Sequence, residues 1–171
     1  MKIRLTEYSE KWVRAFEQEA AFLQTIFKEE LLLIEHFGST AVAGMKAKPV
    51  IDMLCIVKSI ENVDAFNEQM SQLGYDVAGE WGIGGRRLFR KGGEDRTHHI
   101  HFYENGHPEI ARHLIFRDYL KAHPQEVVAY SNFKQQLATR YDTTSEYSPA
   151  KKQFVSEMEK RALRWAAEGE S

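Results

Sequence analysis

The sequence predicts an α+β (mixed α/β) fold, in which a central mixed sheet is joined to a pack of helices at the C-terminal end. Segments with strand composition are concentrated between residues 31 and 103, whereas the last third of the chain has the apolar spacing of helices. The chain has 171 residues, of which 43% are hydrophobic, so it can bury one sizeable core. We therefore expect a single domain over residues 1–171.

Two helices are expected in the first half of the chain. Between Ser9 and Lys28, apolar residues recur at spacings of three and four, which is typical of an amphipathic helix with Ser9 as its N-cap. Ser59 can cap a second helix that Gly74 would end. The buried face of that second helix is expected to contain Val63, Phe66, Met70 and Leu73.

The strands are expected at 31–37, 50–57, 75–78, 86–91 and 97–103. Residues 50–57 are apolar on both faces, so we expect this strand inside the sheet, between the 31–37 and 97–103 strands. Gly92 to Asp95 have the composition of a hairpin turn, and Gly82 to Gly85 form a flexible stretch that could line an opening. Three helices follow, at 108–122, at 124–141 and from Pro149 onward, with Pro149 in the first turn.

Composition excludes several classes of function. The formal net charge is −2, so bulk nucleic-acid binding is not expected. The lone cysteine, Cys55, lies in an apolar strand, where it acts as a small core residue. The N-terminal residues contain no apolar signal core, and no apolar run is long enough to span a bilayer. These features predict a cytoplasmic protein with no membrane partner.

The main candidate site combines a small turn, Gly38-Ser39-Thr40, with the strand acid Asp52. Small residues let the backbone approach a phosphate, and a nearby carboxylate can hold a metal ion that screens phosphate charge. Asp52 lies among apolar neighbours, so its carboxylate needs a cation, a donor or a metal ion. Its alternative role is a structural ion pair. Lys48 precedes the Asp52 strand and is expected near the turn as a point charge for phosphate.

Two histidines form the second part of the candidate site. Alternation along the 97–103 strand places His99 and His101 on one face, about 7 Å apart along the strand axis, so both can reach one ion. One aspartate with two histidines favours zinc or manganese over magnesium, which prefers oxygen ligands. The alternative is a pair of neutral histidines at the edge of a cleft. For Arg87 and Lys91 we favour a solvated, charged edge strand.

Several motifs together resemble the GrpB family of the nucleotidyltransferase-fold superfamily. They are Gly-Ser-Thr-Ala-Val (38–42), Gly44, Ala-Lys-Pro-Val-Ile-Asp (47–52), His-His-Ile-His (98–101), Leu-Ile-Phe-Arg-Asp-Tyr-Leu (114–120), Tyr130, Lys134, Tyr147 and Lys151. The resemblance implies a nucleotidyltransferase-like central mixed sheet. It also places Arg117 in a family-like segment, so we expect Arg117 to face the cleft. Some members of the family are fused to dephospho-CoA kinase, which implies nucleotide or coenzyme A chemistry.

The resemblance has one departure that bears on activity. The superfamily strand normally carries two acids separated by one residue, and here the second position is Leu54. We expect a protein that binds a nucleotide or other phosphorylated small molecule, with metal-dependent nucleotidyl transfer as its activity. Asp52 would be catalytic and would bind the metal with His99 and His101, while Gly38, Ser39, Thr40, Lys48 and Arg117 would bind the ligand. The metal would be manganese, zinc or magnesium.

Two other interpretations stay open from the sequence. One is a non-catalytic ligand-binding or regulatory module that keeps the pocket without a full set of carboxylates. The other is an interaction protein, which an exposed apolar stripe on the 149–167 helix would favour. In the enzyme and the ligand-binding interpretations, Ser39, Asp52 and at least one of the two histidines should line one concave site with a cationic side chain on its rim.

Overall fold

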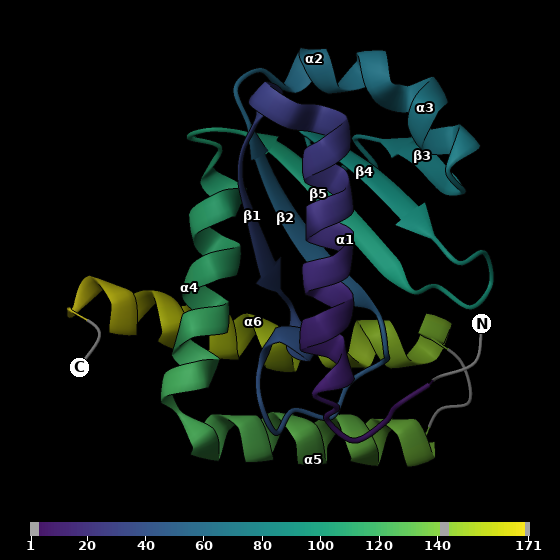
Figure 1. Ribbon diagram of the computed structural model, residues 1–171. Helices are drawn as coiled ribbons and strands as arrows, with labels where there is room; N and C mark the ends of the chain where they lie inside the picture. The colour runs from purple at the N-terminus through teal and green to yellow at the C-terminus, as the bar shows by residue number, and fades with distance from the viewer. Residues whose placement is uncertain (1–3, 141–143, 170–171) are drawn as a thin grey trace.

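The computed structural model describes residues 4–140 and 144–169, which form a five-stranded mixed sheet with helices around it (Figure 1). The strands are β1 (Leu31–Phe37), β2 (Ile51–Val57), β3 (Tyr75–Gly79), β4 (Arg86–Lys91) and β5 (His98–Glu104), in the spatial order β1-β2-β5-β4-β3. β2 pairs antiparallel with β1 and parallel with β5. The prediction that the 50–57 strand lies inside the sheet, between these two neighbours, is therefore confirmed.

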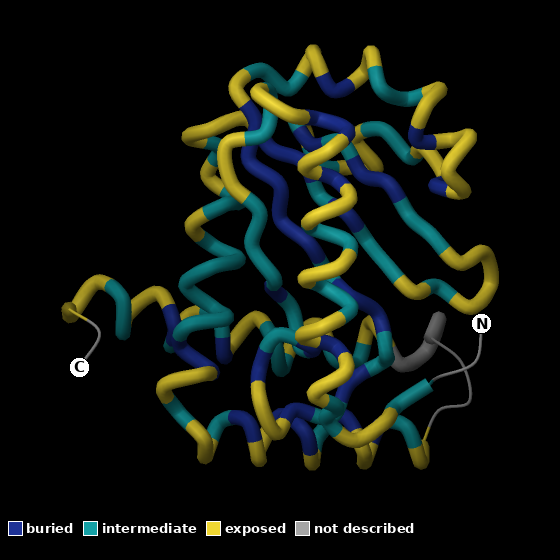
Figure 2. Tube along the Cα trace, in the orientation of Figure 1, coloured by how far each residue is buried: buried dark blue, intermediate teal, exposed yellow. Residues whose placement is uncertain are grey.

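One face of the sheet is covered by α1 (Lys11–Phe27), which packs over β1 and β2 and places Phe27 against Phe102 of β5. Its apolar residues join those of the inner strands in the main core, where Leu23, Met53 and Cys55 are fully buried. Figure 2 shows that the buried part of α1 is the side turned to the sheet, while its outer side is exposed. This arrangement confirms the predicted first helix and the structural role of Cys55.

The second expected helix is interrupted. α2 (Ile60–Val63) and α3 (Asn67–Gln72) are separated by a 3-10 turn at Asp64–Phe66, which places the Asp64 carboxylate 2.7 Å from the Arg87 guanidinium of β4. Val63 and Met70 are buried as expected, whereas Leu73 is exposed. The Ser59 side chain does not cap α2.

The N-terminus of α2 is capped by carboxylates from other parts of the chain. The Ser59 amide donates to Glu30, which lies just before β1, and the Ile60 amide donates to Glu104 at the end of β5. These acids satisfy backbone donors that a helix start leaves without partners. A cap from distant residues cannot be predicted from the local sequence.

The C-terminal helices α4 (Pro108–Ala122), α5 (Pro124–Arg140) and α6 (Thr144–Ala167) pack on one another beside the sheet (Figure 1). They share a second core with the 42–45 loop. This core contains the fully buried Met45 of the loop and Met158 of α6. The expected start of the last helix is wrong, because α6 begins at Thr144 and Pro149 lies inside it. Pro149 therefore lies beyond the first turn, where its nitrogen cannot donate the backbone bond to the residue four positions earlier.

Some expectations for the C-terminal helices need qualification. Tyr141, the expected end of the 124–141 helix, and the side chain of Tyr147 lie outside the described residues. Along α6, Phe154, Val155, Met158, Ala162 and Trp165 pack into the second core, whereas Leu163 is 47% exposed. An isolated exposed leucine does not form the apolar stripe that an interaction protein would need.

The face of the sheet opposite α1 is divided into two parts. Leu54, Phe37 and Tyr103 form an apolar cluster beneath α4 and Ile83. Asp52, two residues before Leu54 on β2, lies beyond this cluster with the histidines of β5. The polar part of this face lies at the N-terminal ends of the parallel strands β2 and β5, next to the C-terminal helices.

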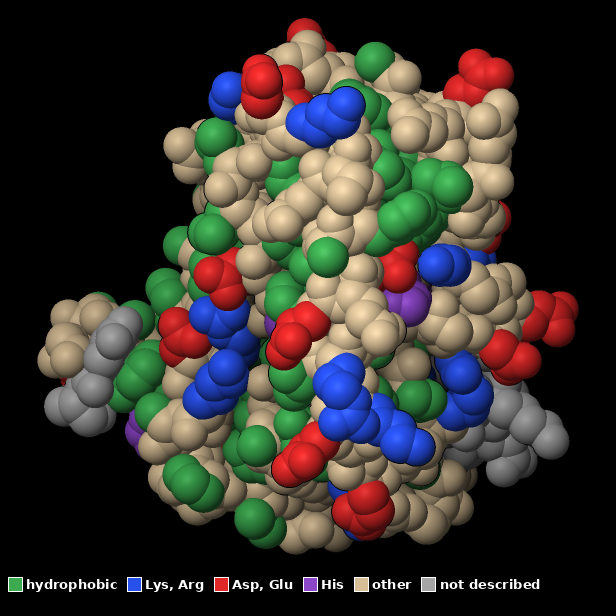
Figure 3. Space-filling view, in the orientation of Figure 1, with side chains coloured by type: hydrophobic (Ala, Val, Ile, Leu, Met, Phe, Trp, Pro, Cys, Tyr) green, Lys and Arg blue, Asp and Glu red, His purple; other side chains and the backbone are tan. Residues whose placement is uncertain are grey.

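The outer surface agrees with the near-neutral charge. On the face seen in Figure 3, basic and acidic side chains are interspersed over the surface. Among the helices described between residues 4 and 169, none is both long and apolar enough to cross a bilayer. The expectation of no bulk nucleic-acid binding stays a prediction.

Candidate functional site

Gly38 and Asp52 are in close contact at the junction of β1 and β2. Phe37, the last residue of β1, is paired with Asp52, and Gly38 follows with φ 73° and ψ −175°. This region of backbone space is essentially open to glycine alone. A Cβ atom at position 38 would lie 2.5 Å from Asp52 Oδ2, so glycine is required for both conformation and space.

Thr40 anchors the turn that follows. The 3-10 turn Ser39–Ala41 buries the Thr40 side chain, whose hydroxyl donates to the Val50 carbonyl oxygen at 3.2 Å and contacts His36 Nε2 at 2.9 Å. Burial lowers the pKa of His36 to about 4, so its ring is neutral near pH 7. The Thr40 hydroxyl therefore ties the turn to the start of β2, whereas Ser39 lines the neighbouring pocket.

Asp52, His99 and His101 form a compact cluster. Asp52 Oδ1 lies 3.7 Å from His99 Nδ1 and 3.4 Å from His101 Nε2, and the ligand atoms of the three residues all lie within 4.8 Å of one another. Burial acts to raise the pKa of Asp52, but the His101 hydrogen bond and the nearby imidazoles outweigh it, so the pKa is lowered. An ionised carboxylate beside two imidazoles is a donor set that fits zinc or manganese.

A second layer of side chains holds His101 in place. Its Nδ1 atom lies 3.5 Å from Arg86 Nη1, and the ring of His113 from α4 lies 6.2 Å away between centroids. Burial and the neighbouring His101 lower the pKa of His113 to about 4, so it does not add charge to the cluster near neutral pH. Such outer contacts fix the orientation of a ligating imidazole.

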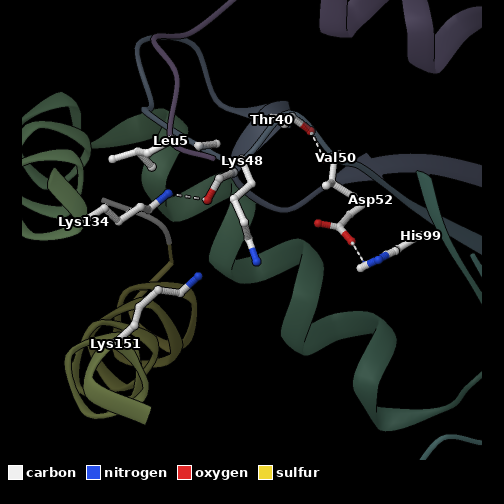
Figure 4. Close-up of a pocket in the computed structure, with 10 residues that line it drawn as sticks. Leu5, Thr40, Lys48, Val50, Asp52, His99, Lys134 and Lys151 are labelled. Atoms are coloured by element: carbon white, nitrogen blue, oxygen red, sulfur yellow. Dashed lines mark hydrogen bonds and ion pairs between the residues drawn. The ribbon is translucent and has the colours of Figure 1, made fainter. Parts of the chain in front are cut away.

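Three lysines converge on a pocket of about 170 Å³ beside this cluster (Figure 4). Lys48 precedes β2, Lys134 comes from α5 and Lys151 comes from α6. The same pocket is also lined by Leu5, Ser39, Thr40, Ala47, Val50, Asp52 and His99. Figure 4 shows the Lys48 and Lys151 side chains extending into the space between α6 and the Asp52 carboxylate. The pocket is therefore cationic on the helical side and carries a carboxylate on the sheet side.

Lys134 is the most deeply buried of these lysines, with 2% of its surface exposed. Its Nζ atom donates to Ser39 Oγ at 2.8 Å and to the Lys46 carbonyl oxygen at 2.7 Å. Burial and the charges of Lys151 and Lys48 lower its pKa to about 6. Burial and Lys48 lower the pKa of Lys151 to about 8, against the opposing effect of Asp52. Burial also lowers the pKa of Lys48.

The structure brings together most of the side chains that the sequence singles out. Ser39, Thr40, Lys48, Asp52 and His99 line the pocket, while Gly38 and His101 contact Asp52. The expected concave site with Ser39, Asp52, a histidine and a cation is present.

Arg117 is not brought into this pocket. Its guanidinium donates to Glu35 at 2.8 Å, to Asp118 at 2.9 Å and to the His36 carbonyl oxygen at 3.0 Å. These bonds hold Arg117 against β1 and its neighbour on α4, so the expectation that it faces the cleft needs correction. Its contacts are those of a residue that joins α4 to the sheet.

Lys134 and Lys151 are the two charged pocket residues that were not assigned a role from the sequence. Both belong to the C-terminal pattern that carries the GrpB resemblance, and this was the only signal that pointed to them. Lysines on amphipathic helices usually lie on the solvated face, so helical spacing alone gives no reason to choose these two.

Comparisons with known proteins agree with the sequence motifs. The family model described as GrpB protein matches residues 2–161. UPF0157 protein YqkA of Bacillus subtilis is 47% identical over 165 residues, which is 96% of this chain and 48% of that protein. The chain thus spans about half the length of this curated relative.

A solved structure has a closely similar fold. The crystal structure of conserved protein GrpB from Enterococcus faecalis has a TM-score of 0.89 and 44% identity, and the match covers 94% of this chain and 97% of that chain. A more distant likeness is to Cid1, described as having RNA terminal uridylyl transferase activity, with a TM-score of 0.49 and 15% identity, covering 78% of this chain and 42% of that chain. Because the GrpB model matches residues 2–161, well over half of the sequence, the chain belongs to the GrpB family.

Proposed function

We propose that the chain binds a nucleotide, or another small molecule with a phosphate chain, in the pocket between the sheet and helices α5 and α6. The observation that carries this proposal is the convergence of Lys48, Lys134 and Lys151 beside the Asp52 carboxylate. Burial lowers the pKa of all three lysines, and repulsion from neighbouring lysines lowers the pKa of Lys134 and Lys151 further. An anion of high charge relieves the repulsion and is therefore the ligand that suits the pocket.

Each polar group in the pocket has a role toward such an anion. Ser39 offers a hydroxyl at the mouth of the Gly38 turn, and Lys134 is already aimed at that hydroxyl. Lys48 and Lys151 supply point charges that can follow the oxygens of a phosphate chain. Because a bound anion favours protonated lysines, binding should be accompanied by proton uptake near neutral pH.

The Asp52, His99 and His101 cluster would hold a divalent ion beside this anion. Such an ion would screen phosphate charge and polarise a phosphoryl oxygen. The Gly-Ser turn ahead of a strand acid supports nucleotidyl transfer as the reaction class. In that reaction the three lysines would stabilise negative charge that develops on the departing pyrophosphate, a role foreseen for Arg117 and better suited to the lysines.

A specific observation favours a second candidate, a non-catalytic ligand-binding module. Leu54 occupies the position of the second superfamily acid and is fully buried against Phe37 and Tyr103. The cluster therefore offers one carboxylate from β2, whereas a two-metal site needs several. This candidate shares the ligand chemistry of the first and differs from it in turnover.

Isothermal titration with tripolyphosphate and with ATP, each with and without manganese, tests the binding proposal. We expect tripolyphosphate to bind, and a ligand present at a hundred times its dissociation constant to stabilise the fold by about 2.7 kcal/mol. Failure of both anions to bind would contradict the proposal. Release of pyrophosphate from nucleoside triphosphates in the presence of manganese separates the enzyme from the binding module.

A further inference from the structure

Trp81 is exposed and lies in an uncommon backbone conformation at the edge of the polar face of the sheet. Its side chain is 60% exposed, and its φ angle is 48°. A bulky residue rarely adopts positive φ, and such strain persists where surrounding contacts enforce it. Trp81 directly precedes Gly82 to Gly85, the stretch that the sequence suggested as the lining of an opening. The structure therefore presents a large aromatic ring to solvent by holding the backbone in a strained state.

Arg86 connects Trp81 to the Asp52 cluster. The Arg86 side chain is buried, and it donates to the carbonyl oxygens of Trp81 at 2.8 Å and of Glu80 at 3.1 Å. Its Nη1 atom also lies 3.5 Å from His101 Nδ1. One guanidinium thus fixes both the backbone that carries the exposed ring and an imidazole of the cluster.

Arg90 places the Trp81 ring at a defined distance from the Asp52 cluster. Its guanidinium lies over the Trp81 ring, with Cζ 4.4 Å from the ring centroid. In the sheet, Arg90 is paired with His99, and His99 is paired with Asp52. Because neighbouring strands lie about 4.8 Å apart, Arg90 and Asp52 are separated by about 10 Å across the sheet. A row therefore runs from Trp81 and Arg90, through His99 and Asp52, to the lysines.

We propose that Trp81, supported by Arg90, is a stacking subsite for a planar aromatic ring at the end of the site opposite the lysines. The inference rests on the proposed function, because the phosphate pocket fixes the other end of the row. The ring is the base of the nucleotide whose phosphates the lysines bind, or the base of an acceptor that meets it at Asp52. In both cases the ligand ring stacks on one face of the Trp81 indole, and the Arg90 guanidinium that lies over the indole strengthens this stacking.

Binding measurements on Trp81→Ala and Trp81→Phe test this subsite. The probes are tripolyphosphate, which has no ring, ATP, and adenosine, which has no phosphate; adenosine is titrated alone and into protein saturated with tripolyphosphate. We expect Trp81→Ala to bind tripolyphosphate as the wild type does, because the indole is outside the lysine pocket. Loss of base stacking should weaken ATP binding by about five- to a hundredfold, with Trp81→Phe retaining most of the affinity.

The outcomes separate the sources of the ring and the two proposals. Weakened ATP binding assigns the subsite to the base of the bound nucleotide. Unchanged ATP binding with weakened adenosine binding to the tripolyphosphate-saturated protein assigns it to the acceptor. If neither changes, the subsite is wrong while the phosphate pocket stands. If tripolyphosphate does not bind the wild type, the proposed function fails, and the titration with adenosine alone then decides the subsite. Adenosine binding to the wild type that is lost in Trp81→Ala supports the subsite. Failure of adenosine to bind the wild type overturns it.

Discussion

Lys134 Nζ lies 2.8 Å from Ser39 Oγ, which connects helix α5 to the turn that follows β1. The two residues are 95 positions apart in the sequence. Their contact closes one wall of the candidate pocket and fixes a lysine where its charge is disfavoured. Protonation of Lys134 in the folded protein therefore costs free energy, and this cost depends on pH.

Lys134→Met should change how stability depends on pH. The pKa of Lys134 is lowered from 10.5 to about 6 by burial and neighbouring lysines, so between these values the unfolded chain binds the extra proton. The free energy of unfolding therefore rises with pH in this window, by at most about 1.4 kcal/mol per unit from this group. The variant should lose that slope between about pH 6 and 8 and be more stable than the wild type at pH 7. Urea unfolding at several pH values measures the slope.

Lys160→Met is the matched control, because Lys160 is exposed on α6 and pairs with Glu157. It should keep the slope of the wild type. Equal slopes for the wild type and Lys134→Met would show that Lys134 is protonated in the folded protein.

Arg117 and Lys48 should respond to substitution in opposite ways. Arg117→Met removes bonds to Glu35, Asp118 and the His36 carbonyl oxygen, so it should lower the free energy of unfolding by about 1–3 kcal/mol and leave tripolyphosphate affinity unchanged. Lys48→Met should weaken tripolyphosphate by about tenfold, as loss of a charged contact does, with little loss of stability. Chemical denaturation and titration calorimetry measure the two effects. A large loss of affinity in Arg117→Met would return Arg117 to the binding site.

Gly38→Ala should disrupt the junction of β1 and β2. An alanine there would take a backbone conformation reserved for glycine and would bring its Cβ against Asp52 Oδ2. The expected loss is about 1–3 kcal/mol, together with a weaker response to metal because Asp52 must move. Gly84→Ala is the control, since apart from its chain neighbours no atom would lie within 4 Å of the added Cβ. Thermal unfolding of both variants measures the difference, and equal melting temperatures would contradict the argument.

Leu54→Asp should fail to supply a second metal-binding acid. The Leu54 side chain is fully buried with Phe37 and Tyr103, so a carboxylate there would be desolvated within an apolar cluster. We expect a loss of at least about 2 kcal/mol in the free energy of unfolding. Leu54→Met, which conserves volume, should cost less than about 1.5 kcal/mol. A stable Leu54→Asp protein that gains turnover with manganese would show that the site tolerates a second acid.

Metal binding by Asp52, His99 and His101 should raise the melting temperature of the wild type in zinc or manganese. Asp52→Asn should remove most of that rise, because it takes away the anionic ligand while leaving a similar shape. Asp76→Asn is the control: Asp76 pairs with Arg96 at the surface, outside the cluster. An unchanged response in Asp52→Asn would leave the histidines as polar residues of the cleft.

The inner sheet and the histidine cluster were predictable because strand periodicity is local. The unbroken apolar run of β2 indicated a central position, and alternation placed His99 and His101 on one face. Their meeting with Asp52 required only that β2 and β5 be neighbours, which the apolar run already favoured.

Other features depend on contacts between distant residues. Lys134 and Lys151 look like ordinary helical lysines until α5 and α6 are packed against the Ser39 turn. The same packing decides that Arg117 faces Glu35. The break between α2 and α3 and the cap from Glu30 and Glu104 likewise involve partners outside the segment, so local spacing could not reveal them.

The two cores meet at the candidate pocket, with Asp52 and His99 on the sheet and Lys134 and Lys151 on the helices. A ligand that contacts both the sheet and the C-terminal helices would link two cooperative units of the fold. Amide hydrogen exchange in α5 and α6 should then slow on binding, even at positions that the ligand does not touch. Such protection would allow binding in the pocket to be detected at amides on the far side of the helical pack.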